Sequence, residues 1–195
     1  MPRRGLHSKE ELESLIFSSA KKLLIKKGLK NLSARKLAAE IDYTPGTIYS
    51  FFKNIDELVM HINAESLETL YMEFLELYNN CKSPKKALTD IAQVYIKFYE
   101  KNQALWSALF EYNYKSTTKI PKWYKEQVKK IFDLLAELIN SASNKKINAE
   151  NLARVFWAGL HGIIALTHNR KLAIAGVTTE KVLVKDFIDN FTKGI

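Results

Sequence analysis

The sequence predicts an all-α protein of about nine helices, and three observations favour this fold class. Only 7 Gly and 4 Pro occur among 195 residues, so little material is present for turns between many short elements. Apolar residues recur at the i, i+3 and i+4 spacing of a helix face, and no stretch keeps the alternation of a strand for long. Hydrophobic residues make up 47% of the chain and charged residues 26%, which is typical of a soluble globular protein.

The first expected helix begins at Ser8 and ends at Gly28, because glycine often follows the last turn of a helix. Ser8 and Glu11 match a capping box, in which two otherwise unpaired N–H groups each find a side-chain acceptor. Its inner face consists of apolar residues at helical spacing: Leu12, Leu15, Ile16, Ala20, Leu23 and Leu24. Arg3 and Arg4 precede this helix, and they form either a basic arm for nucleic acid or a frayed terminus.

Residues 33–52 indicate two short helices joined by a tight turn. Ser33 is suited to cap the first helix and Thr44 the second, since each hydroxyl can accept from a first-turn N–H group. Pro45 fits the first position of the second helix, where no N–H is needed. Asp42 lies in the turn, and aspartate tolerates the left-handed backbone that ends many helices. Such a helix-turn-helix can place its second helix in the major groove of DNA.

The positive charge of the chain is concentrated around this motif. Residues 1–53 carry 11 Lys and Arg against 5 Asp and Glu, which is +6 of the total net charge of +9. An excess of this kind neutralises DNA phosphates, although lysine-rich surfaces also occur in proteins that bind no nucleic acid. The charge distribution therefore agrees with DNA binding without distinguishing it from a solvated basic surface.

Three short segments carry a resemblance to a known family: Leu-Ala-Ala-Glu-Ile at 37–41, Thr-Pro-Gly-Thr-Ile-Tyr-Ser-Phe-Phe at 44–52, and Asp-Glu-Leu at 56–58. Together they resemble the DNA-binding domain of the TetR family of regulators. Two positions depart from the family pattern, because Asp42 stands where glycine is usual and Ile55 where lysine is frequent. Lys53 is the candidate to make the backbone contact that Ile55 cannot make.

The resemblance implies a DNA-binding domain over residues 8–54 and a larger helical domain over 55–195 that binds an effector and dimerises. The implied function is that of a ligand-responsive transcriptional regulator, commonly a repressor, which leaves a near-palindromic operator in double-stranded DNA when a small effector binds. The alternative is an effector-independent helical DNA-binding protein of nucleoid or cell-division architecture.

The residues expected to contact DNA are polar, cationic or turn-forming, and each type has a physical role. Hydroxyls suit phosphate oxygens and cations neutralise phosphates, whereas Tyr43, Pro45 and Thr47 are the candidates for contacts to bases. The full set is Arg3, Arg4, Ser33, Arg35, Tyr43, Thr44, Pro45, Thr47, Tyr49 and Lys53.

Beyond the motif, the sequence predicts a helix over about 56–81 and further helices that begin near Pro84, Asn102, Pro121, Asn148 and Thr179. Aromatic residues gather in the middle helices, where they either line a cavity for an apolar or aromatic effector or simply form core. The candidate effector-binding residues are Tyr95, Phe98, Tyr99, Trp106, Phe110, Trp123, Tyr124, Phe132 and His161.

The helix expected over 149–169 is apolar on nearly every side, which requires burial on more than one face. Its Trp157, His161 and Gly162 resemble one branch of TetR C-terminal domains. We expect this helix and the last one to pair with their copies in a homodimer. The interface residues expected are Trp157, Leu160, Ile164, Val184, Phe187, Ile188 and Phe191.

No catalytic grouping is visible in the sequence, and we expect neither an enzyme nor a cofactor. His161 and His168 are seven residues apart and can share a helix face, but metal sites usually need three or four ligands and no others lie nearby. A hydrogen-bonded core histidine is the simpler interpretation. The N-terminus lacks an apolar signal segment and the longest apolar run, 156–166, is too short for a bilayer, so we expect a cytoplasmic protein.

Overall fold

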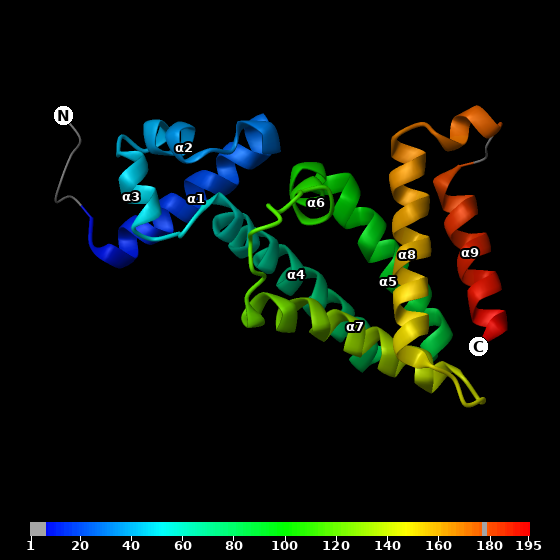
Figure 1. The fold of residues 1–195 in the computed structure, drawn as a ribbon. Helices are drawn as coiled ribbons and strands as arrows, with labels where there is room; N and C mark the ends of the chain where they lie inside the picture. Colours follow the sequence, from blue (N-terminus) through cyan, green and yellow to red (C-terminus); the bar gives the residue numbers. More distant parts are fainter. Residues whose placement is uncertain (1–6, 177–178) are drawn as a thin grey trace. The chain divides into compact units, whose positions relative to one another are not determined.

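The computed structural model describes residues 7–176 and 179–195, and within them every regular element is helical (Figure 1). The predicted all-α fold class is confirmed, whereas Arg3 and Arg4 lie outside the described residues. The α-helices in this part of the chain are α1 Lys9–Lys27, α2 Ala34–Glu40, α3 Pro45–Tyr49, α4 Ile55–Asn80, α5 Pro84–Lys101, α6 Gln103–Phe110, α7 Lys122–Ala142, α8 Ala149–His168 and α9 Glu180–Gly194. Short 3-10 helices, η1 Leu29–Asn31 and η2 Leu172–Ala175, follow α1 and α8.

The chain divides into two compact units, each made of two separate segments. The first unit contains Met1–Leu67 and Tyr99–Tyr124, and therefore holds α1, α2, α3, α6 and the first half of α4. The second unit contains Glu68–Phe98 and Lys125–Ile195, with the remainder of α4, most of α5 and α7, and all of α8 and α9. Helix α4 thus contributes residues to both units.

Helix α1 begins and ends where the sequence predicts, through local hydrogen bonds. The Ser8 hydroxyl accepts from the Glu11 N–H at 3.1 Å, and the Glu11 carboxylate accepts from the Ser8 N–H at 2.7 Å. Gly28 ends the helix with φ of +74°, and its N–H donates to the Leu24 carbonyl. A φ in this left-handed region favours glycine, since a side chain would be strained there.

Helices α1, α2 and α3 enclose a small apolar core in the first unit. Helix α2 contacts both α1 and α3, so the three helices form one packed cluster. The side chains that fill it are almost completely buried: Ile16, Ala20, Leu23, Leu24, Leu37, Ala38, Ile48 and Phe52. Leu12 and Leu15, which the sequence places on the same face of α1, are only half-buried.

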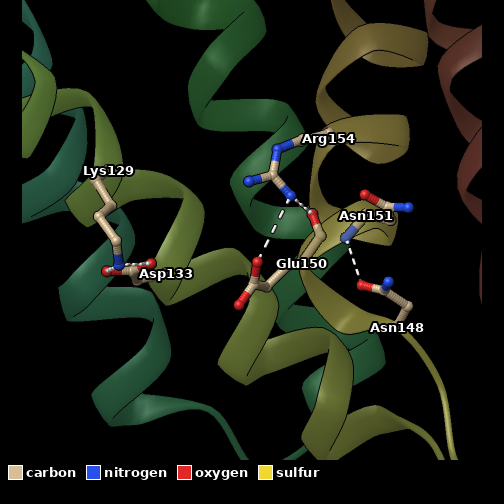
Figure 2. Close-up of polar contacts among 6 residues, drawn as sticks. All are labelled: Lys129, Asp133, Asn148, Glu150, Asn151 and Arg154. Carbon is tan, nitrogen blue, oxygen red and sulfur yellow. Dashed lines mark hydrogen bonds and ion pairs between the residues drawn. The ribbon is translucent and has the colours of Figure 1, made fainter.

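In the second unit, the start of α8 is capped as predicted (Figure 2). The Asn148 side-chain oxygen accepts from the Asn151 N–H at 3.1 Å, and the Arg154 guanidinium donates to the Glu150 carbonyl one turn away at 2.9 Å. Exposed pairs spaced four residues apart, such as Arg154 with Glu150, contribute only about 0.3–0.5 kcal/mol each. The cap therefore positions α8, while its apolar packing supplies most of the stability.

Helices α8 and α9 lie side by side in the second unit and pack through aromatic rings (Figure 1). Phe156 is 1% exposed, and its ring centroid lies 5.8 Å from that of Phe187 and 5.2 Å from that of Phe191. Gly159 lets α9 approach closely, because a Cβ there would lie 2.5 Å from the Phe187 ring and would displace it. Among the described residues, no helix combines the length and hydropathy that a membrane span requires.

Candidate functional site

The helix-turn-helix is formed by α2, α3 and the turn between them. The Ser33 hydroxyl accepts from the Lys36 N–H at 3.3 Å and caps α2. Asp42 follows α2 with φ of +61°, and the Tyr43 N–H then closes the turn by donating to the Ala38 carbonyl at 2.9 Å. Asp42 therefore takes the left-handed conformation that the sequence predicts, at the position where the family usually has glycine.

Helix α3 is short, and its cap also follows the prediction. The Thr44 hydroxyl accepts from the Thr47 N–H at 3.3 Å, and Pro45 occupies the first helical position. Ile48 is 1% exposed and holds α3 against the core. The opposite side of α3 is open to solvent, since Thr44 and Pro45 are exposed and Tyr49 is 52% exposed.

The structure places the remaining predicted DNA-binding residues around the same motif. Arg35 is exposed in the first turn of α2, and Lys53 is exposed after α3. Ser33 and Thr47 are half-buried, and the Thr47 hydroxyl lies 3.0 Å from that of Thr44. The hydroxyls of Ser33, Thr44 and Thr47 thus take part in local capping contacts as well as being candidates for phosphate contacts.

His7 is a residue of this surface that the sequence does not single out. Its Nδ1 lies 2.9 Å from the hydroxyl of Tyr43, which is half-buried in the turn between α2 and α3. The two residues are 36 positions apart, so no local spacing in the sequence could have indicated this contact.

A buried carboxylate organises the start of α4, next to the motif. Asp56 is 3% exposed and accepts hydrogen bonds from the Tyr112 hydroxyl at 2.6 Å, the Lys115 N–H at 3.3 Å and the Thr118 hydroxyl. Burial by itself raises the pKa of Asp56, but these hydrogen bonds, together with the Lys115 charge, hold it below its ordinary value. Burial, and then the bond to Asp56, raises the pKa of Tyr112. Asp56 therefore remains ionised and holds the segment after α6.

The segment held in this way, residues 111–121, is called the α6–α7 loop below. It borders a cavity of about 580 Å³ together with the start of α4. The Asn54 side-chain oxygen caps α4 by accepting from the Glu57 N–H at 2.8 Å. The lining residues are Lys53, Asn54, Glu57, Met60, Lys115, Thr117, Thr118, Lys119 and Pro121. Cations of the loop thus lie on the same cavity as Lys53, a predicted DNA-binding residue.

Five of the predicted effector-binding residues belong to the first unit: Tyr99, Trp106, Phe110, Trp123 and Tyr124. The ring of Trp106 makes edge contacts with two of these residues, at centroid distances of 5.0 Å to Tyr99 and 5.2 Å to Phe110. Trp123 is 37% exposed and stacks on His61 at 4.6 Å, which places it at the surface. Tyr124 is buried, and burial together with the hydrogen bond between its hydroxyl and that of Tyr114 raises its pKa.

The other four effector candidates, Tyr95, Phe98, Phe132 and His161, belong to the second unit. The Tyr95 hydroxyl lies 2.8 Å from Nδ1 of His161. Trp157 joins this pair to Phe132, at centroid distances of 5.1 Å to His161 and 5.8 Å to Phe132. Phe98 is buried. The nine candidates are therefore shared between the two units, and their role in binding an effector stays a prediction.

Four of the predicted dimer residues are already buried within a single chain. Leu160, Ile164, Val184 and Ile188 are 0–3% exposed, and Trp157, Phe187 and Phe191 are half-buried. The apolar side chains that α8 and α9 leave exposed are different ones: Val155 at 54%, Leu166 at 46% and Val182 at 43%. The homodimer stays a prediction, and these three residues are large apolar side chains that α8 and α9 leave exposed to a partner.

The two helix-α8 histidines considered for metal binding have separate partners. His161 contacts Tyr95, and the Nε2 atom of His168 lies 3.1 Å from the Glu180 carboxylate at the start of α9. Within residues 7–176 and 179–195, no three His, Cys, Asp or Glu side chains are grouped so as to hold a metal ion.

A chain that is helical in its described regular elements, and whose N-terminal helix-turn-helix exposes hydroxyls and cations, belongs to the class of helix-turn-helix regulators. Residues 16–62 match the model of the bacterial regulatory proteins of the tetR family, and residues 88–187 match the tetracyclin repressor-like C-terminal domain. The chain therefore belongs to the tetR family of bacterial regulatory proteins, which confirms the predicted resemblance.

Comparison with individual proteins agrees with this assignment. An uncharacterized HTH-type transcriptional regulator from Haemophilus influenzae is 41% identical over 69 residues, which is 35% of this chain and 36% of that protein's length. A protein with unknown function from Rhodococcus sp. RHA1 is similar over 99% of both chains, with a TM-score of 0.77 and 18% identity. FadR from Bacillus subtilis, in complex with stearoyl-CoA, is similar over 93% of this chain and 98% of its own, with a TM-score of 0.73 and 13% identity. At such low identities the structural similarities show the fold alone.

Proposed function

We propose that the protein is a transcriptional repressor that a small effector with an apolar part releases from its operator. The observation that carries this proposal is the geometry of α2, Asp42 and α3. Both helices are capped and Ile48 is buried beneath α3, so that Thr44, Pro45 and Tyr49 face outward. A second helix held in this way can enter the major groove of DNA.

Affinity for DNA would come from phosphate contacts, and specificity from fewer contacts to bases. Arg35 and Lys53 are exposed cations on either side of α3, and the hydroxyl of Tyr49 suits a phosphate oxygen. Pro45 and Thr47 are suited to a thymine methyl group and to a base hydrogen bond, which discriminate modestly. Two half-sites bound by a dimer, about 34–36 Å apart, would supply the remaining specificity.

A homodimer would present both motifs at once. Val155, Leu166 and Val182 support such an interface, because they leave apolar surface exposed on α8 and α9. Replacing Val155 with glutamate should yield monomers in size-exclusion chromatography without unfolding the chain, since this side chain is 54% exposed. An unchanged elution volume would place the interface elsewhere.

The effector would bind among the aromatic residues of the middle helices. FadR, whose fold is similar, binds stearoyl-CoA, and fatty acyl-CoA is therefore the first class of effector to test. A polar group is also available: Asn63 is 0% exposed, its amide donates to the Ala108 carbonyl and the Tyr114 hydroxyl, and its Oδ1 has no partner among the described residues. A buried acceptor of this kind favours a ligand or water that donates a hydrogen bond.

Release from DNA requires the effector to bind one conformation of the protein more tightly than the other. Helix α4 contributes residues to both compact units, and it begins directly after the motif. A change in its position is therefore the simplest route by which an effector could alter the spacing of two recognition helices. A protein of this kind would act on chromosomal DNA in the cytoplasm.

An electrophoretic mobility-shift assay with fragments flanking the protein's own gene tests the proposal. We expect binding to one fragment that survives excess nonspecific competitor and weakens when an acyl-CoA is added. Sequence-specific binding that no tested acyl-CoA weakens would support the regulator function and exclude acyl-CoA as the effector. Binding that is indifferent to sequence would instead indicate an architectural DNA-binding protein.

Substitution of Tyr49 sharpens the test of the DNA-binding face. Loss of one phosphate hydrogen bond costs about 1 kcal/mol, so Tyr49→Ala should weaken operator binding about fivefold. Met72→Ala is a matched control, because Met72 is exposed to the same degree, at 54%, but lies in the second half of α4. Equal affinities for the two variants would show that α3 does not face DNA.

A further inference from the structure

A second basic surface adjoins the helix-turn-helix, and of its residues only Lys53 is among those that the sequence assigns to DNA. It is the cavity of about 580 Å³ between the start of α4 and the α6–α7 loop. Figure 1 shows this loop running from the end of α6 past the first turns of α4. Lys53 contributes to the cavity from one side, and Lys115 and Lys119 contribute from the loop.

The charges that line this cavity favour an anion. Its charged residues are three lysines and one glutamate. Among the described residues none of the three ammonium groups forms an ion pair, and Lys115 acts on Asp56 only at longer range, through its charge. The Glu57 carboxylate accepts from the Lys53 backbone N–H at 2.5 Å, so that its charge is partly satisfied by the chain. The start of α4, a helix of 26 residues, adds its partial positive charge on the same side.

The loop that carries Lys115 and Lys119 is held in place by hydrogen bonds. Residues 111–121 contain no helical turn, but the buried carboxylate of Asp56 holds them through Tyr112, the Lys115 N–H and Thr118. A loop fixed at three points loses little conformational entropy when its side chains bind a ligand. The position of Lys115 and Lys119 next to Lys53 is thus a built feature of the first unit.

We propose that this cavity binds a phosphate group of the DNA backbone, so that Lys115 and Lys119 extend the DNA-binding surface beyond the helix-turn-helix. The proposal rests on the proposed DNA-binding function. Duplex DNA carries one phosphate charge per about 1.7 Å of its axis, so a surface that shares Lys53 with the motif would meet further phosphates of the same duplex. A point charge such as an ammonium group neutralises a phosphate without reading the base, and the loop would therefore add affinity but no sequence preference.

The test is the salt dependence of operator binding by the double variant Lys115→Gln/Lys119→Gln. Each phosphate contact contributes about −0.9 to the slope of log K against log salt concentration. With one phosphate in the cavity, the double variant should therefore lose about threefold less affinity than the wild type between 50 and 200 mM salt. Its preference for the operator over a scrambled duplex should be unchanged. The Lys115 N–H that donates to Asp56 belongs to the backbone and is retained in the variant.

Lys145→Gln/Lys146→Gln is the matched control, because it removes the same charge from exposed positions between α7 and α8. Its salt slope should equal that of the wild type. The proposal would be overturned if the salt slope of Lys115→Gln/Lys119→Gln equalled that of the wild type. It would also be overturned if the control variant showed the same change in slope. A wild-type protein that binds no operator would overturn the proposed function itself.

A free phosphate-bearing molecule is the other possible source of the same chemistry. Thermal unfolding with adenosine 3′,5′-bisphosphate as the probe distinguishes it, since a ligand that binds the folded state raises the melting temperature. No rise is expected for either the wild type or the double variant. A rise in the wild type alone, with equal salt slopes, would assign the cavity to a nucleotide and overturn the DNA contact.

Discussion

Around the start of α4, one buried carboxylate gathers a loop through hydrogen bonds, whereas α8 and α9 are packed through the rings of three phenylalanines. Asp56 accepts from Tyr112, Lys115 and Thr118, so that region depends on the charge of one group. Phe156 instead contacts rings on α9, and that region depends on side-chain volume. The stability of the first region should therefore depend on pH and on the hydrogen-bond acceptor. The stability of the second region should depend on whether side-chain atoms are removed or added.

Of the single substitutions compared below, removal of the Phe156 ring should lower the free energy of unfolding most. Phe156→Ala leaves a cavity between α8 and α9 and should lower the free energy of unfolding by about 3–5 kcal/mol. Urea denaturation followed by circular dichroism measures this loss. Asn151→Ala, an exposed position on the same helix, should change the free energy of unfolding by less than about 0.5 kcal/mol. Similar losses in the two variants would show that the ring contacts do not stabilise the α8–α9 pair.

Replacement of the Asp56 carboxylate should have the next largest effect. Asp56→Asn keeps the shape of the side chain but loses an acceptor for buried donors, which should cost about 1–3 kcal/mol. Asp90→Asn is the control, because Asp90 pairs with Lys86 at 2.7 Å on an exposed face and should cost only about 0.3–0.5 kcal/mol. The same denaturation experiment measures both, and a loss at Asp56 no greater than at Asp90 would contradict the buried network.

Two glycines of α8 test how closely α9 approaches. Gly159→Ala should destabilise the chain by about 1–3 kcal/mol, because the new Cβ would lie 2.5 Å from the Phe187 ring. Gly162→Ala places its Cβ in open space, and should raise the free energy of unfolding by up to about 1 kcal/mol through helix propensity. Thermal unfolding of the two variants side by side measures both effects. A loss of stability at Gly162 would show that a second chain packs against this position.

The pH dependence of the free energy of unfolding also distinguishes the two regions, and it is the smallest of the expected effects. The folded-state pKa of Asp56 lies below its ordinary value of 3.8, so the folded protein binds this proton more weakly than the unfolded chain does. The stability that Asp56 contributes is therefore complete above about pH 5 and is lost as the pH falls through the folded-state pKa. The difference between wild type and Asp56→Asn should be constant from about pH 5 to 8 and shrink below about pH 4. The difference between wild type and Phe156→Ala should not change, and an equal pH response of both variants would contradict the comparison.

Much of the fold could be predicted because helix ends depend on neighbours in the sequence. The caps at Ser8, Ser33, Thr44 and Asn148 each join groups only three residues apart, so the residue types suffice to identify them. The apolar spacing of the helices is local for the same reason. The motif and its family could thus be predicted before any tertiary contact was known.

The surroundings of the candidate site could not be predicted from the sequence, because the residues that lie near it come from distant parts of the chain. Lys115 and Lys119 lie on the same cavity as Lys53, although more than 60 residues separate them in the sequence. Leu160 and Val184, two of the residues predicted for a dimer interface, are buried within one chain, and the dimer itself stays a prediction. Periodicity shows which side of a helix is apolar, not which neighbour covers it.

The sequence by itself determined the helices in the part of the chain that the structure describes, the left-handed turn at Asp42 and the family, since each depends on groups within a few residues or on a contiguous motif. Only the tertiary structure decided what Asp56 holds, which cations accompany Lys53, and which apolar side chains of α8 and α9 remain exposed. The physical reason is distance along the chain. A hydrogen bond across 56 residues depends on how every intervening element packs, and no local pattern of residues records that packing.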